Sequence, residues 1–135
     1  MRNILFRGKA INRDPDREYR TSYKNGDWVY GLVSKLHDEQ YDFPAEMTNE
    51  IGVSGIDVDY RTIGEWTGMT DKNGVKIFEG DIVANTLINK CGCVAWDSNC
   101  AAFVVTLDGT RYGLSTVEGN IYEVVANIYY PPYLL

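Results

Sequence analysis

The chain reads Thr67-Gly-Met-Thr-Asp-Lys-Asn-Gly-Val-Lys-Ile-Phe-Glu-Gly-Asp-Ile-Val83 near its middle, and turn signals alternate there with short apolar runs. The Asn73-Gly74 pair favours a tight turn with a positive φ angle, and residues 75–78 after it are typical of a short strand. Glu79-Gly80 indicates a second bend, from which a further strand begins at Asp81. We therefore expect short β-strands joined by tight turns in the second half of the chain.

Three more β-type runs follow this segment, at residues 92–96, 101–107 and 119–130. The Asp108-Gly109 pair after the second run is a hairpin signal. About five short strands within residues 67–135 predict a small, partly closed β-barrel of the SH3-like kind, because closure hides the edges that short strands would expose.

The first half of the chain predicts a long-looped β-hairpin. Residues 3–10 and 28–33 are short apolar runs, separated by a polar segment and by the turn signal Asn25-Gly26-Asp27. A weak helical pattern at residues 36–47 is interrupted by Pro44, which cannot continue a helix. The expected fold is mainly β, with an N-terminal β-hairpin lobe over residues 1–66 packed on the barrel in a single domain.

The composition indicates an acidic protein with free thiols. The 135 residues carry 13 basic and 19 acidic side chains, a net charge of −6, which opposes general binding to phosphate backbones. Cys91, Cys93 and Cys100 are an odd number, and no apolar secretory segment follows Met1, so reduced thiols in a cytosol are expected. No apolar run approaches the ~20 residues of a membrane span, so no membrane partner is expected.

Several blocks along nearly the whole chain resemble the YopX-like proteins encoded by bacteriophages and prophages. They are Ile4-Leu5-Phe6-Arg7-Gly8-Lys9, Asn25-Gly26-Asp27-Trp28-Val29-Tyr30-Gly31, Thr62-Ile63-Gly64-Glu65-Trp66-Thr67-Gly68-Met69, Asp71-Lys72-Asn73-Gly74 with Ile77-Phe78-Glu79-Gly80-Asp81-Ile82-Val83, and Glu123-Val124-Val125-Ala126-Asn127-Ile128-Tyr129. The loop at residues 12–24 is longer than is usual in that family, and Ala126 stands where a glycine is frequent. The resemblance implies a mainly β phage protein of unknown biochemical role in the cytoplasm of a bacterial host, and it brings no catalytic residues to this chain.

No catalytic residue, metal site or cofactor is predicted. Cys91, Cys93 and Cys100 with the lone His37 would be four ligands for zinc, but a Cys-x-Cys spacing is shorter than the two to four intervening residues usual in structural sites. His37 has carboxylate neighbours and no marked nucleophile, so an exposed loop histidine is expected.

Asp71, Glu79 and Asp81 are candidates for an oxygen-rich cation site. The segment lacks the alternate acidic ligands of a calcium loop, and Asp81 is placed to accept backbone N–H bonds at a bend. The structural role is therefore the prediction for these carboxylates.

Two candidate surfaces remain. The end of the chain is apolar, uncharged and stiffened by proline, so it must dock on its own chain or on a neighbour; its residues are Tyr129, Tyr130, Pro131, Pro132, Tyr133, Leu134 and Leu135. Residues 1–24 hold seven Lys or Arg against three Asp or Glu, a basic strip with tyrosines available for stacking on bases. The strip consists of Arg2, Arg7, Lys9, Arg13, Arg17, Arg20 and Lys24, with Tyr19 and Tyr23.

The leading hypothesis is a non-enzymatic phage or prophage accessory protein, a protein-interaction module that self-associates. The alternative is a nucleic-acid-associated or regulatory protein that uses the basic strip, which the net negative charge disfavours. Trp28, Trp66 and Phe78 stand in β-type runs beside turn glycines, so all three are expected in the core.

Overall fold

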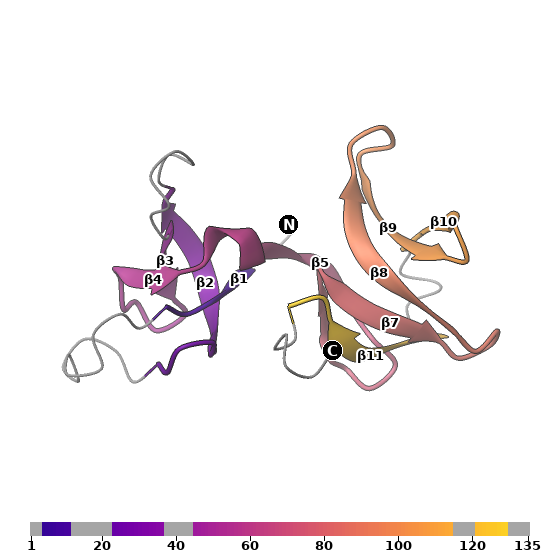
Figure 1. Cartoon of the computed structure of the whole chain (residues 1–135), viewed down its shortest axis with the longest axis horizontal. Helices are drawn as coiled ribbons and strands as arrows, with labels where there is room; N and C mark the ends of the chain where they lie inside the picture. The colour runs from indigo at the N-terminus through magenta and orange to yellow at the C-terminus, as the bar shows by residue number, and fades with distance from the viewer. Residues whose placement is uncertain (1–3, 12–22, 37–44, 115–120, 130–135) are drawn as a thin grey trace. The chain divides into compact units, whose positions relative to one another are not determined.

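The computed structural model describes residues 4–11, 23–36, 45–114 and 121–129 (Figure 1). These residues are mainly β-structure, as predicted, with one short 3-10 helix. Two compact units are present: one is Ile4–Glu65, and the other begins at Trp66. That the two units form a single domain stays a prediction.

The N-terminal unit is an antiparallel sheet whose strands pair in the order β4-β3-β2-β1. Its elements are β1 (Phe6–Lys9), β2 (Trp28–Lys35), β3 (Ala45–Asn49), β4 (Ile56–Val58) and the 3-10 helix η2 (Tyr60–Thr62). The predicted hairpin is the β1–β2 pair, with Phe6 opposite Gly31. A single bridge between Ala10 and Val58 connects the residue after β1 back to β4, so the sheet curls around its core.

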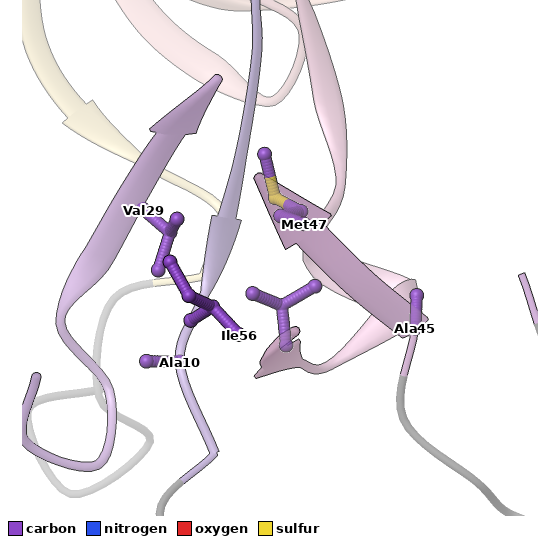
Figure 2. Close-up of a cluster of buried hydrophobic side chains, with 6 residues drawn as sticks. Ala10, Val29, Ala45, Met47 and Ile56 are labelled. Carbon is purple, nitrogen blue, oxygen red and sulfur yellow. The ribbon is translucent and has the colours of Figure 1, made fainter. Parts of the chain in front are cut away.

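The core of this unit comes from alternate residues of the strands, because alternate side chains of a strand point to the same face. Figure 2 shows these side chains pointing toward one another from the strands and from the end of β1. The cluster comprises Ala10, Val29, Ala45, Met47, Ile56 and Val58. It packs directly on the backbone of β1, since a Cβ atom added at Gly8 would lie 3.1 Å from the sulfur of Met47.

The C-terminal unit is built on a five-stranded antiparallel sheet of order β10-β9-β8-β7-β11. The strands of this sheet are β7 (Asp81–Asn85), β8 (Lys90–Asp97), β9 (Ala102–Leu107), β10 (Thr110–Gly113) and β11 (Tyr122–Asn127). The short strand β6 (Lys76–Phe78) lies outside this sheet. The strand β5 (Gly64–Thr70) belongs to both units, because its first residues pair with β1 and its later residues pair with β6. The buried cluster comprises Ile77, Val83, Val94, Val105, Leu107 and Tyr122.

The predicted barrel does not close among the described residues. Closure of the five-stranded sheet would need β10 and β11 to pair, and they lie at its opposite edges. The strand β10 was not predicted, and β3 begins one residue after Pro44, in the segment where that proline interrupts the weak helical pattern. The predicted turn is confirmed, with Gly74 at φ 81°.

Of the three aromatic residues predicted to be buried, one is. The Phe78 side chain is 2% exposed, and its backbone N–H donates to the Asp81 carboxylate at 2.8 Å, as expected of an aspartate at a bend. The prediction is wrong for Trp28 and Trp66, which are half-buried. Trp66 donates its indole N–H to the carbonyl oxygen of Met69 at 2.9 Å, which holds the ring near the surface.

Candidate functional site

The two edges of the five-stranded sheet differ in how their backbone groups are satisfied. At the β11 edge, Val124 donates its N–H to the Asp71 carboxylate at 2.9 Å, and the carbonyl oxygen of Tyr122 accepts from the N–H of Lys72 at 3.0 Å. The turn after β5 therefore covers this edge as a further strand would.

Asp71 is the residue that fixes the turn in that position. Its other carboxylate oxygen accepts the N–H groups of Asn73 at 2.8 Å and Val75 at 2.9 Å, and the residue is 3% exposed. Burial acts to raise the pKa of Asp71, but the N–H groups of Val124, Val75 and Asn73 and the charge of Lys72 outweigh it, so the pKa is lowered. Asp71 is thus a structural carboxylate, in agreement with the sequence-based prediction.

Among the described residues, no segment covers the β10 edge. All four residues of Thr110–Gly113 are exposed. The strand follows a two-residue hairpin loop, in which Asp108 and Gly109 have φ angles of 50° and 77°, as a type I′ turn requires.

The direction of the β10 backbone groups follows from this hairpin. Thr110 lies opposite Leu107, and Leu114 donates its N–H to the carbonyl oxygen of Phe103 at 3.0 Å. Hydrogen-bonded and non-hydrogen-bonded pairs alternate along an antiparallel ladder, so even-numbered residues of β10 bond to β9. The N–H and C=O groups of Arg111 and Gly113 consequently face outward, away from the sheet.

Aromatic side chains lie on the core-facing side of the sheet, on the edge strand β10 and on the two strands next to it. Trp96 of β8 is 46% exposed, and its ring meets that of Phe103 edge-to-face with centroids 5.0 Å apart. Tyr112 of β10 is 44% exposed and lies opposite the buried Val105, so it projects to the same face. Figure 1 shows β8 and β9 extending together to their connecting loop, with β10 beside β9.

The opposite face of the same strands carries an ion pair over a shallow depression. Arg111 contacts the Asp97 carboxylate at 2.7 Å. The pKa of Asp97 is lowered, chiefly by the N–H of Asn99 and then by the Arg111 side chain. The depression has a volume of about 340 Å³ and is lined by Ala95, Trp96, Asp97, Ser98, Asn99, Val104, Thr106 and Arg111.

We call Trp96, Asp97, Arg111 and Tyr112, together with the open backbone of β10, the β10 edge site. Trp, Tyr and Arg are the residue types enriched at the energetic centres of protein interfaces. The site offers aromatic surface, an oriented guanidinium and backbone groups to which no described residue bonds at the outer side of β10, and these features suit protein binding. The Asp108-Gly109 hairpin signal could have located β10 from the sequence, because a two-residue loop must be followed by a paired strand.

A family model described as YopX protein matches residues 18–135. The chain belongs to the YopX family. A search of curated proteins gave no match.

The basic strip predicted in this YopX-family chain is described at four of its nine positions. Arg7 is 6% exposed, and its guanidinium carbon lies 4.2 Å from the ring centroid of Trp28; the Lys9 ammonium lies 5.0 Å from the same centroid. Tyr23 packs on the N-terminal core and accepts a hydrogen bond from the Asn49 amide at 3.2 Å. Lys24 is exposed at the turn before β2. Arg2, Arg13, Arg17, Tyr19 and Arg20 lie outside the described residues.

The side chains of Arg7, Lys9 and Tyr23 make contacts within the N-terminal unit. Cation–π contacts stabilise Arg7 and Lys9 against Trp28, and a guanidinium as buried as that of Arg7 is poorly placed to reach a phosphate. Tyr23, packed on the core of the YopX-family chain, is likewise poorly placed to stack on a base.

The apolar tail predicted as an interface is described only at its first residue. Tyr129 is half-buried on its own chain, where its ring lies so close to Gly80 that an added Cβ atom would be 2.7 Å from it. Ile128 donates its N–H to the carbonyl oxygen of Gly80 at 2.8 Å. Tyr130, Pro131, Pro132, Tyr133, Leu134 and Leu135 lie outside the described residues.

The cysteines of the YopX-family chain are free thiols on or near β8. Cys91 and Cys100 are exposed and Cys93 is half-buried. Burial, followed by the nearby Asp81 charge, raises the pKa of Cys93. In the described ranges no group of three or more His, Cys, Asp or Glu side chains could hold a metal ion, and His37 lies outside them. No helix in the described part of the chain is long and apolar enough to cross a membrane.

Proposed function

We propose that this chain is a non-enzymatic protein-interaction module that self-associates, encoded by a phage or prophage and acting in the cytoplasm of its bacterial host. The observation that carries the proposal is the β10 edge site, where an open strand edge carries the exposed Tyr112 and the exposed Trp96 lies two strands in on the same face. An exposed strand edge is a template for pairing with another chain, and proteins that do not use such an edge usually cover it. In this sheet only the β11 edge has such a cover among the described residues.

The aromatic residues of the site add apolar area to what the strand edge provides. Trp96 packs against Phe103 and keeps about half of its surface exposed, so a partner would find the ring already oriented. An oriented aromatic ring loses little conformational freedom on binding, which favours affinity. Burial of a large aromatic side chain contributes on the order of 1.5–3 kcal/mol before the costs of association.

A nucleic-acid partner has weaker support. The chain carries a net charge of −6, and the guanidinium of Arg7 is buried. General affinity for nucleic acid comes from Lys and Arg side chains that neutralise phosphates, and it needs them to be accessible.

Light scattering of the intact chain tests the proposal. At micromolar concentration we expect a mass above the 15.3 kDa of one chain, and replacement of Trp96 and Tyr112 by Ala should weaken association by at least about tenfold, as removal of interface aromatics does. Tyr60→Ala is a matched control, because Tyr60 is a partly exposed aromatic in the N-terminal unit. A monomeric intact chain contradicts the proposal of self-association.

A pull-down from the lysogenic host, with and without nuclease, separates the two classes of partner. Proteins that remain bound after nuclease treatment support a protein-interaction module. Binding that disappears on nuclease treatment supports the nucleic-acid alternative.

A further inference from the structure

The geometry points to a second copy of this chain as the partner of β10, joined edge to edge in an antiparallel strand pair centred on Tyr112. This inference rests on the proposed self-association and specifies its interface. A strand pair of this kind has twofold symmetry, so each copy uses the same surface. It would join two five-stranded sheets into one continuous sheet.

The outward-facing backbone groups of β10 match such a pair. Arg111 and Gly113 direct their N–H and C=O groups away from β9, and they lie one residue on either side of Tyr112. Around a twofold axis at Tyr112, Arg111 of each copy therefore stands opposite Gly113 of the other. Each such pair exchanges two backbone hydrogen bonds, so the interface forms four.

The side chains favour this register over its neighbour. Tyr112 meets its symmetry mate at a non-hydrogen-bonded position, where side chains are closest and aromatic pairs are favourable. Arg111 meets a glycine, so no side chain obstructs it. A register centred on Arg111 would instead place two arginines directly opposite each other, and like charges in that position are destabilising.

An isolated charge on an edge strand would oppose pairing with a second chain, but Arg111 does not. Short edge strands with charged residues are a common device against association. Here the guanidinium is bound to Asp97 at 2.7 Å, over one face of the sheet, while the backbone of the same residue remains at the edge. The ion pair holds the side chain over that face and compensates part of its charge, so Arg111 leaves the edge accessible to a second copy.

Two substitutions at Gly113 test the pairing. Gly113→Pro removes an outward N–H and leaves the ladder with β9 intact, since proline is tolerated where the N–H of an edge strand faces solvent. Gly113→Ala is the matched control, because it keeps the N–H and an added Cβ atom would meet nothing within 4 Å. By light scattering the intact chain and Gly113→Ala should be dimers, with twice the 15.3 kDa mass of one chain. Gly113→Pro should be monomeric at the same concentration with an unchanged circular dichroism spectrum.

Disulfide trapping tests the register and remains informative if the proline variant does not fold. In a background with Cys91, Cys93 and Cys100 replaced by Ser, Tyr112→Cys should form a covalent dimer on oxidation, because facing Cα atoms at such a position are about 4.5 Å apart. Arg111→Cys should not form a covalent dimer, because the Cα atoms of residue 111 in the two copies would be diagonal neighbours about 8 Å apart.

The outcomes separate this inference from the proposed function. If the intact chain associates but a folded Gly113→Pro does so equally, or if Arg111→Cys is trapped and Tyr112→Cys is not, the β10 pairing centred on Tyr112 is wrong and self-association stands. If the intact chain is monomeric at micromolar concentration, self-association itself fails.

Discussion

Asp71 joins two segments that are far apart in the sequence. One carboxylate oxygen organises the turn at residues 71–75, and the other binds the N–H of Val124, which is 53 positions away. Buried N–H groups that lose an ionised acceptor are left unsatisfied, and this is costly in free energy. The side chain therefore matters more to stability than its place in a turn suggests.

Asp71→Asn should lower the free energy of unfolding by about 2–3 kcal/mol at neutral pH, because one N–H acceptor becomes an amide donor. The folded-state pKa of Asp71 is lowered from its ordinary value of 3.8. A lowered folded pKa stabilises the native state fully above the unfolded pKa, and this stability is lost as the pH falls through the folded pKa. The difference between wild type and variant should therefore be constant from about pH 7 to pH 5 and shrink below about pH 4. Urea unfolding at a series of pH values measures it, and a difference that stays constant into strong acid would contradict the assignment.

Cys93 should be the least reactive of the three thiols at neutral pH. Its pKa is raised by burial and by the charge of Asp81, and alkylation requires the thiolate. We expect iodoacetamide to label Cys91 and Cys100 before Cys93, as followed by peptide mass spectrometry. The three rates should converge in denaturant, where burial is removed. Labelling of Cys93 first in the folded protein would show that its surroundings favour the thiolate.

At the scale of the elements, β8 and β9 approach each other closely at Gly92. A Cβ atom added there would collide with the carbonyl oxygen of Thr106 and lie 2.9 Å from Leu107. The neighbouring atom is backbone, so it cannot move aside as a flexible side chain would.

Gly92→Ala should therefore lower the free energy of unfolding by about 1–3 kcal/mol, the usual effect of overpacking. Gly113→Ala introduces the same methyl group where it meets nothing within 4 Å and should change stability by less than about 0.5 kcal/mol. Denaturant melts of the two variants give the comparison. Equal stabilities would mean that β8 and β9 separate readily at this point.

The elements that the sequence predicted are those whose signals are local. Asn73-Gly74 places a turn because positive φ angles favour these residue types, and the short strands on either side follow from it. Closure of a barrel has no such local signal, because it depends on whether two strands far apart in the chain pair. The side chain of Asp71 covers the β11 edge instead, and no local pattern predicts a contact across 53 positions.

The candidate site was less predictable than the fold. The sequence indicated an aromatic excess and a hairpin at Asp108-Gly109, but it did not show that Trp96 and Tyr112 share one face beside an open edge. That placement follows from strand register, which is set by pairing across the sheet. The half-buried position of Trp28 was not predictable for the same reason. Its ring contacts Arg7 and Lys9 of the neighbouring strand, and these contacts depend on how the strands pair.

At the scale of the whole molecule, deletion of residues 130–135 should leave the mass in solution unchanged. The sequence alone favoured this tail as an interface, yet Tyr129 at its start packs on Gly80 of the same chain. Light scattering of the truncated chain beside Gly113→Pro distinguishes the two interfaces. A truncated chain that becomes monomeric while Gly113→Pro still associates would assign self-association to the tail.

The unequal edges of the five-stranded sheet also determine how far an assembly can grow. A sheet with two open edges adds copies at both ends and can extend into a fibre. In this sheet the turn held by Asp71 occupies the β11 edge, so within the described ranges β10 is the edge left to pair. In the proposed dimer the two β10 edges are paired and the two β11 edges keep this cover, so no open edge of this sheet remains among the described residues and growth through it stops at two copies. Asp71→Asn should loosen that cover, so the proposed dimer predicts that this variant grows into fibres, which thioflavin T fluorescence would detect.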